Sequence, residues 1–205
     1  MENHLVKFAF AISLASVGPC AAQIGGTQQL NTRLSPAEFR TIAGACAPDI
    51  PFVTLRAIAR AESAFHPYAL SLDHPGRTAR EHGFKEGGIF LARQPTTLAE
   101  ARAWTHWLLK HGQTVSIGLV QVSTQRAADL RVSVDELFEP CTNIRAGARL
   151  LTTEYQRAAA VRGEGQEALR QALSEYNSGS PTLGLDNGYI SSVECGELYA
   201  KRSPK

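Results

Sequence analysis

The chain has 205 residues, of which 43% are hydrophobic and 20% are charged, and its formal net charge at pH 7 is +2. This length and apolar content predict one globular domain with a substantial core. The basic residues form no block of the kind that follows a phosphate backbone, so the composition argues against nucleic-acid binding.

The N-terminus has the features of a secretory signal. Lys7 precedes an apolar run from Phe8 to Val17, and small residues surround Cys20. We therefore expect residues 1–22 to be a signal peptide and residues 23–205 to form one exported domain. No later run approaches the ~20 apolar residues of a membrane span, so no transmembrane segment is expected in the mature chain. Acylation of Cys20 is the less favoured alternative, because Pro19 precedes it where a small residue is usual.

Three cysteines remain after removal of the signal: Cys46, Cys141 and Cys195. In an oxidising compartment this number predicts one disulfide and one free thiol. The sequence leaves the pairing open, and we prefer Cys46 with Cys141. The spacings match no common metal-ligand pattern, so neither a metal nor another cofactor is expected.

Capping patterns and apolar periodicity predict a mainly α fold. The strand-like stretches are the glycine-rich region 69–95 and the apolar run 116–122, which allow at most a minor β-hairpin. Trp104 and Trp107 are interpreted as core residues. The expected helices span residues 36–45, 52 to about 65, 98–111, a short stretch after Ser133, 142 or 143 to 162, and 166–177.

Glu62 is the most informative residue of the chain. At 100° per residue it shares an apolar arc with Leu55 and Ile58, whereas Arg56, Arg60 and Ser63 fall on another arc. No Lys or Arg stands at its i−4, i+3 or i+4 position. Because burial disfavours the charged form, an inward carboxylate should have a raised pKa and could serve as a general acid. Position alone leaves a structural role equally open.

Three short motifs follow one another along the chain: Glu62-Ser63, Gly118-Leu119-Val120-Gln121 and Glu175-Tyr176-Asn177. Their order and spacing resemble the soluble lytic transglycosylase and goose-type lysozyme superfamily. In that family a Glu-Ser pair ends the catalytic helix, a Gly-Leu-Met-Gln-like segment lines the cleft, and an Ala-Tyr-Asn-like segment closes it. Here Val120 replaces the usual methionine and Glu175 the usual alanine.

The resemblance extends from Cys46 to Tyr189. It looks closest to the periplasmic transglycosylases of type IV secretion and conjugation systems. The supporting stretches are residues 58–68, 93–95, 138–144 and 187–189.

The resemblance implies a lysozyme-like α domain in the periplasm that opens peptidoglycan for the secretion machinery, with other secretion components as possible partners. Protonated Glu62 would donate to the glycosidic oxygen between N-acetylmuramic acid and N-acetylglucosamine, then deprotonate the C6 hydroxyl so that a 1,6-anhydro ring closes. Ser63, Gln121, Tyr176 and Asn177 are the expected substrate-binding residues. A helix-capping role for Ser63, a satisfied buried amide for Gln121 and a packing role for Tyr176 stay open.

A second catalytic carboxylate, which most glycoside hydrolases need, is not evident among Asp73, Glu175 and Asp186. Two alternatives are therefore kept: a muramidase that cleaves the same bond with water, and a catalytically silent wall-binding scaffold. His66, His74 and His82 are interpreted as solvated histidines and not as a metal site.

Overall fold

The computed structural model describes residues 32–73, 91 and 93–195, and the expected signal peptide, His74, His82 and the C-terminal end lie outside these ranges. The mainly α fold is confirmed. The elements in chain order are α1 (Pro36–Cys46), α2 (Phe52–Ser63), β1 (Leu70–Asp73), α4 (Leu98–Lys110), β2 (Thr114–Ile117), β3 (Val122–Ser123), η1 (Thr124–Arg126), α5 (Ala127–Leu130), η2 (Glu136–Phe138), α6 (Pro140–Arg162), α7 (Gln166–Ser178), α8 (Leu183–Asp186) and α9 (Tyr189–Cys195).

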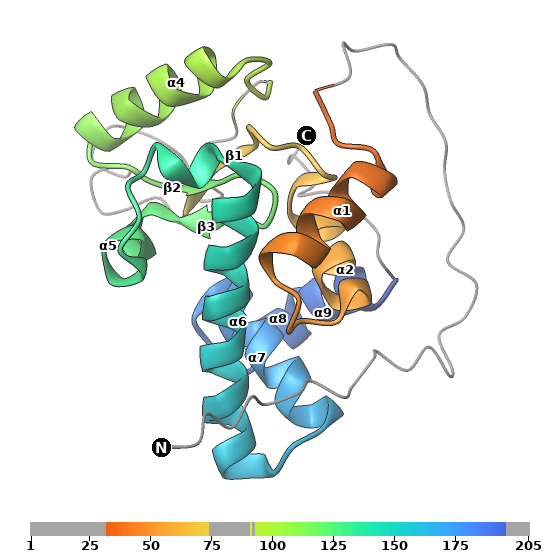
Figure 1. The fold of residues 1–205 in the computed structure, drawn as a ribbon. Coiled ribbons are helices and arrows are strands. Elements are labelled where there is room, and N and C mark those ends of the chain that lie inside the picture. Colours follow the sequence, from red (N-terminus) through yellow and green to blue (C-terminus); the bar gives the residue numbers. More distant parts are fainter. Residues whose placement is uncertain (1–31, 74–90, 92, 196–205) are drawn as a thin grey trace.

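Helix α6 is the central element of the domain. Figure 1 shows α1 and α2 on one side of it, the sheet and α4 on the other, and α7 packed against its lower half. Its buried stripe includes Ile144, Leu151 and Tyr155, at the spacing of one helix face. The helix starts at Pro140, slightly before the expected residue, because proline fits the first helical position.

Helix α2 ends two residues earlier than expected, at Ser63. Ala64 and Phe65 both adopt positive φ angles, 51° and 64°, which stop the helix. Arg33 binds the C-terminal end of this helix: its Nη1 donates to the carbonyls of Ser63 and Ala64 at 3.0 and 2.9 Å. Glu62 therefore stands in a last turn whose carbonyl groups are held by a cation.

The sheet has three antiparallel strands in the order β1-β2-β3, so β1 adds a strand to the expected hairpin. Ser71 pairs with Ser116, and Ser116 pairs with Ser123. The intervening residues Leu72, Val115 and Ile117 are buried. One face of the sheet is thus apolar and the other polar, as the two-residue period of a strand requires.

The buried row of α4 runs through Ala101, Thr105 and Leu108. Trp104 is partly buried beside this row, with the Arg93 guanidinium 4.8 Å from its ring centre. The core role predicted for Trp107 is wrong, since this residue is 60% exposed and stacks on His111. It lies about 100° around the helix from Leu108, off the buried row.

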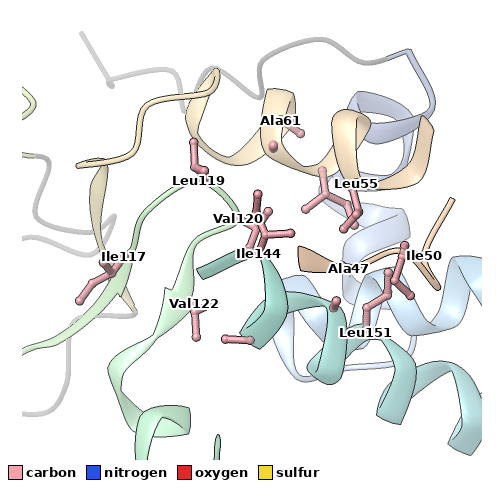
Figure 2. Packing of buried hydrophobic residues seen from close by; sticks show 14 of the residues in the cluster. Ala47, Ile50, Leu55, Ala61, Ile117, Leu119, Val120, Val122, Ile144 and Leu151 are labelled. Atoms are coloured by element: carbon pink, nitrogen blue, oxygen red, sulfur yellow. The ribbon is translucent and has the colours of Figure 1, made fainter. Parts of the chain in front are cut away.

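The hydrophobic core joins the sheet to the helices. Figure 2 shows Leu119 and Val120, in the connection between β2 and β3, packed among Leu55 and Ala61 of α2 and Ile144 of α6. All five side chains are buried. The connection between the two strands is therefore part of the core and not a surface loop.

The preferred cysteine pairing is confirmed: a disulfide joins Cys46 and Cys141, whose Cα atoms are 5.4 Å apart. It links the end of α1 to the first turn of α6 across a sequence separation of 95 residues. Closing so long a loop removes many conformations from the unfolded chain.

Replacing both cysteines by alanine should therefore lower the free energy of unfolding by about 2–5 kcal/mol. Chemical denaturation of the double variant and of the oxidised wild type measures the difference. Reduced wild type serves as the control and should resemble the double variant. An unchanged denaturation midpoint would show that the bond adds nothing to stability.

Candidate active site

Glu62 lies half-buried in the last turn of α2, with the orientation expected from its sequence position. Leu55, Ile58 and Ala59 of the same helix are buried, whereas Arg56 and Arg60 are exposed. Ser63 departs from the expected arc, because it is only 8% exposed. The inward face of the helix therefore carries an acid followed by a hydroxyl.

Two tyrosines lie close to Glu62. Burial raises the pKa of the Tyr176 phenol well above its ordinary value, and the negative charge of Glu62 raises it further. Burial and the charge of Glu62 have the same effect on the pKa of Tyr189. Both phenols are therefore protonated over the whole physiological range, and they surround the carboxylate with neutral hydroxyl groups.

The contact between Tyr189 and Glu62 is close but not ideal. A hydrogen bond with Glu62 contributes to the raised pKa of Tyr189. Among the described residues, however, the buried Tyr189 hydroxyl has no partner at the distances and angles of a hydrogen bond. The phenol therefore lies close enough to Glu62 for the carboxylate charge to raise its pKa, without a well-formed hydrogen bond between the two groups.

The motif residues converge on one piece of backbone, the turn Gly118–Gln121 that joins β2 to β3. The Ser63 hydroxyl donates to the carbonyl of Leu119 at 2.8 Å. The Tyr176 hydroxyl donates to the carbonyl of Val120 at 2.6 Å. Two of the predicted substrate-binding residues thus hold the turn, each from a different helix.

Gln121 is held entirely by protein groups. It has a positive φ of 50°. Its Nε2 donates to the carbonyls of Ala69 at 3.1 Å and Gly118 at 2.9 Å, and its Oε1 accepts from the Ser71 hydroxyl at 2.7 Å. These contacts favour the interpretation of Gln121 as a satisfied amide that ties the turn to β1.

Asn177 is the most exposed of the five predicted site residues. Its Oδ1 accepts from Asn187 Nδ2 at 3.1 Å, and Asn187 Oδ1 accepts from the backbone N–H of Tyr189 at 2.9 Å. The end of α7 is thereby connected to the start of α9. Tyr176 is also partly exposed although its hydroxyl is buried, so a ligand could reach both Tyr176 and Asn177.

Two residues of this region were not singled out from the sequence: Tyr189 and Asn143. Tyr189 begins the short helix α9, and only its place within the family-like stretch 187–189 indicated it from the sequence. Asn143 is a buried amide on the same stripe of α6 as Gly147 and Leu151. An isolated polar residue on an apolar stripe is the signal that identified Glu62, and it applies equally to Asn143.

His66 is buried and not solvated as expected, with 5% of its surface exposed. Its Nδ1 accepts from the backbone N–H of Tyr68 at 3.1 Å. Burial lowers the pKa of His66, and the positive charge of Arg33 lowers it further. The ring is a neutral structural element of the loop that follows Glu62.

The carboxylate of Asp73 accepts hydrogen bonds from the hydroxyls of Ser116 and Ser123 on the polar face of the sheet. Within the ranges that the structure describes, no group of three His, Cys, Asp or Glu residues could hold a metal ion. In the same ranges no helix combines the length and the apolar character needed to cross a membrane.

A hollow of about 400 Å³ is lined by Leu91, Arg93, Trp104, Trp107 and Leu108. It contains none of the residues around Glu62, and its lining is mostly apolar. Glu62 lies among polar groups, so its surroundings are the better candidate for the active site.

Comparison with known proteins relates the chain to one protein family. Residues 40–190 match the model of the transglycosylase SLT domain. The chain is 32% identical to Protein virB1 of Rhizobium radiobacter over 170 residues, 82% of this chain and 64% of that protein. It is 33% identical to Protein virB1 of Agrobacterium fabrum over 161 residues, 78% and 60% of the two chains.

A third relative is the type IV secretion system protein virB1 of Brucella suis, 33% identical over 148 residues, 72% of this chain and 56% of that protein. The chain thus spans 56–64% of the length of these relatives. No solved structure gives a significant match.

The lowered pKa of His66 predicts a dependence of stability on pH. Because the unfolded histidine binds a proton more readily than the folded one, this contribution to stability is present above the ordinary pKa of 6.5 and is lost as pH falls below it. His66→Asn keeps an acceptor for the Tyr68 N–H but cannot titrate. The free energy of unfolding of wild type should therefore fall relative to that of His66→Asn between pH 7.5 and 5. Parallel pH profiles of the two proteins would contradict the assignment.

Proposed function

We propose that this chain, which belongs to the transglycosylase SLT domain family, is a lytic transglycosylase that cleaves peptidoglycan. The observation that carries the proposal is the position of Glu62. It is half-buried in a final helical turn, close to two phenols whose hydroxyls are buried, and its neighbour Ser63 is bonded to the turn Gly118–Gln121. A carboxylic acid partly removed from water beside neutral hydroxyl groups is suited to proton transfer with a bound substrate.

In the proposed reaction, protonated Glu62 donates its proton to the oxygen between N-acetylmuramic acid and N-acetylglucosamine. The bond from the anomeric carbon to that oxygen breaks, and N-acetylglucosamine leaves with the proton. The N-acetyl group of the muramic acid assists at the anomeric carbon. Glu62 then takes the proton of the C6 hydroxyl, whose oxygen bonds to the anomeric carbon and closes the 1,6-anhydro ring. The acid is regenerated and no water is consumed.

The site residues have two kinds of role in this proposal. Ser63 and Gln121, whose polar groups are engaged with the protein, act by holding the turn in place. The accessible part of Tyr176 and the exposed Asn177 amide contact the sugar. The Tyr176 hydroxyl, bonded to Val120, keeps its ring beside Glu62.

The cellular role follows from the relatives. One of them is named a type IV secretion system protein. We place this chain in the periplasm, where it would open the wall locally so that a secretion or conjugation apparatus can assemble. Other components of that apparatus are the proposed partners, besides the glycan strands themselves.

Hydrolysis of the same bond is the second candidate, because Asp73 is a half-buried carboxylate on the polar face of the sheet. A hydrolase would release a reducing sugar in place of the anhydro sugar. Asp73→Asn would then be the variant to test. A catalytically silent scaffold would release neither product.

Glu62→Gln should remove turnover on purified peptidoglycan, with a loss of at least about 10²-fold, because the amide cannot donate and recover the proton. Mass spectrometry of the released muropeptides measures both the rate and the chemistry of the product ends. Glu167→Gln, which changes an exposed carboxylate of α7, is the matched control and should keep wild-type turnover. Undiminished release of anhydro products by folded Glu62→Gln would refute the assignment, as would full rescue of secretion by this variant in cells.

A further inference from the structure

Asn143, in the first turn of α6, is only 1% exposed, yet its side chain makes three hydrogen bonds to backbone groups. Its Oδ1 accepts from the N–H of Val120 at 2.9 Å. Its Nδ2 donates to the carbonyls of Ile117 at 2.8 Å and Leu137 at 2.9 Å. One amide thus satisfies a backbone group at the end of β2, one in the connection between β2 and β3, and one in η2.

The turn is fitted closely to this amide. Gly118 has a φ of +83°, and a Cβ atom placed on it would lie 2.5 Å from Asn143 Nδ2. One helical turn further along α6, a Cβ on Gly147 would lie 2.5 Å from Val120 Cγ2 and 2.8 Å from the Tyr176 hydroxyl. The first two turns of α6 therefore form a surface against which the turn Gly118–Gln121 and Tyr176 are seated.

The same turn also contacts the candidate catalytic groups. Leu119 accepts from Ser63, the neighbour of Glu62, and Val120 accepts from Tyr176, whose pKa is raised in part by the charge of Glu62. A shift of the turn would displace both contacts together. The disulfide at Cys141, two residues before Asn143, attaches this end of α6 to α1 and limits such a shift.

We propose that Asn143 is a positioning residue of the reaction: it fixes the turn Gly118–Gln121, and through the turn it sets the places of Ser63 and Tyr176 beside Glu62. This inference rests on the proposed function. The position requires an amide, because it needs one acceptor and two donors within a single flat group. Aspartate supplies acceptors only, and serine can serve only part of the set, so each leaves buried backbone groups unpaired.

The test compares Asn143→Asp and Asn143→Ser with Glu154→Gln. Glu154 is a buried residue of the same helix, 7% exposed and paired with Arg157, and it lies about 16 Å further along the axis. Its substitution disturbs α6 without touching the turn. Turnover on peptidoglycan is measured where denaturation curves show every protein to be folded.

We expect kcat of the Asn143 variants to fall about 10–100-fold with little change in KM, because small misplacements of reacting groups are costly. Glu154→Gln should keep the wild-type kcat. Asn143→Asp should also regain activity relative to wild type on acidification, because a protonated carboxyl recovers one donor. Wild-type kcat in the folded Asn143 variants, or an equal loss in Glu154→Gln, would overturn the proposal.

Hydrogen exchange of the peptide that contains residues 117–121 gives a readout independent of turnover. It should accelerate in the Asn143 variants and not in Glu154→Gln, and unchanged exchange would count against the proposal. If wild type releases no product, the proposed function fails, while this measurement still decides whether Asn143 holds the turn. If the Asn143 variants do not fold, Gly118→Ala disturbs the same contact, and a wild-type kcat in that protein would overturn the proposal.

Discussion

The arrangement of the helices around the site depends on the hydrogen bonds that a buried turn of backbone requires. The turn Gly118–Gln121 enters the core with Leu119 and Val120, and polar backbone groups taken out of water are costly unless they are hydrogen-bonded. The strands beside the turn supply only part of the partners. Side chains supply the others: Ser63 from α2, Asn143 from α6, Tyr176 from α7, and Gln121 from the turn itself. Three helices that are distant in sequence are thereby brought to one point.

The electrostatics around Glu62 follow from that arrangement. Tyr176 is held beside the acid by its bond to Val120, and Tyr189 is brought there by the short helix α9. Both hydroxyls are buried, so a second negative charge next to Glu62 is strongly disfavoured. The two phenols therefore keep their protons, which leaves the proton transfers of the proposed mechanism to the carboxylate of Glu62.

Stability and activity depend on the same hydrogen bonds in this site. Ser63, Gln121 and Tyr176 belong to the family-like motifs, yet their polar groups bond to the protein's own backbone. Loss of activity after substitution of any of them would therefore not identify a substrate contact unless the folded fraction were measured as well. Asn177 differs, because its side chain is exposed and, within the described part of the chain, its amide bonds to the side chain of Asn187.

The sequence by itself determined the features that depend on neighbours within about four residues. Caps such as Ser35 placed the helices, and periodicity turned Glu62 inward. The order of the three motifs also came from the sequence, through the family resemblance. The cysteine count indicated one disulfide, but the tertiary structure decided that Cys46 and Cys141 form it. Tertiary structure decided the burial of Ser63 and His66, the exposure of Trp107, the addition of β1 to the sheet, and the arrival of Tyr189 beside Glu62. The reason is physical: the partner of Ser63, the carbonyl of Leu119, is 56 residues away in sequence, and no local pattern records which distant backbone group will need a donor.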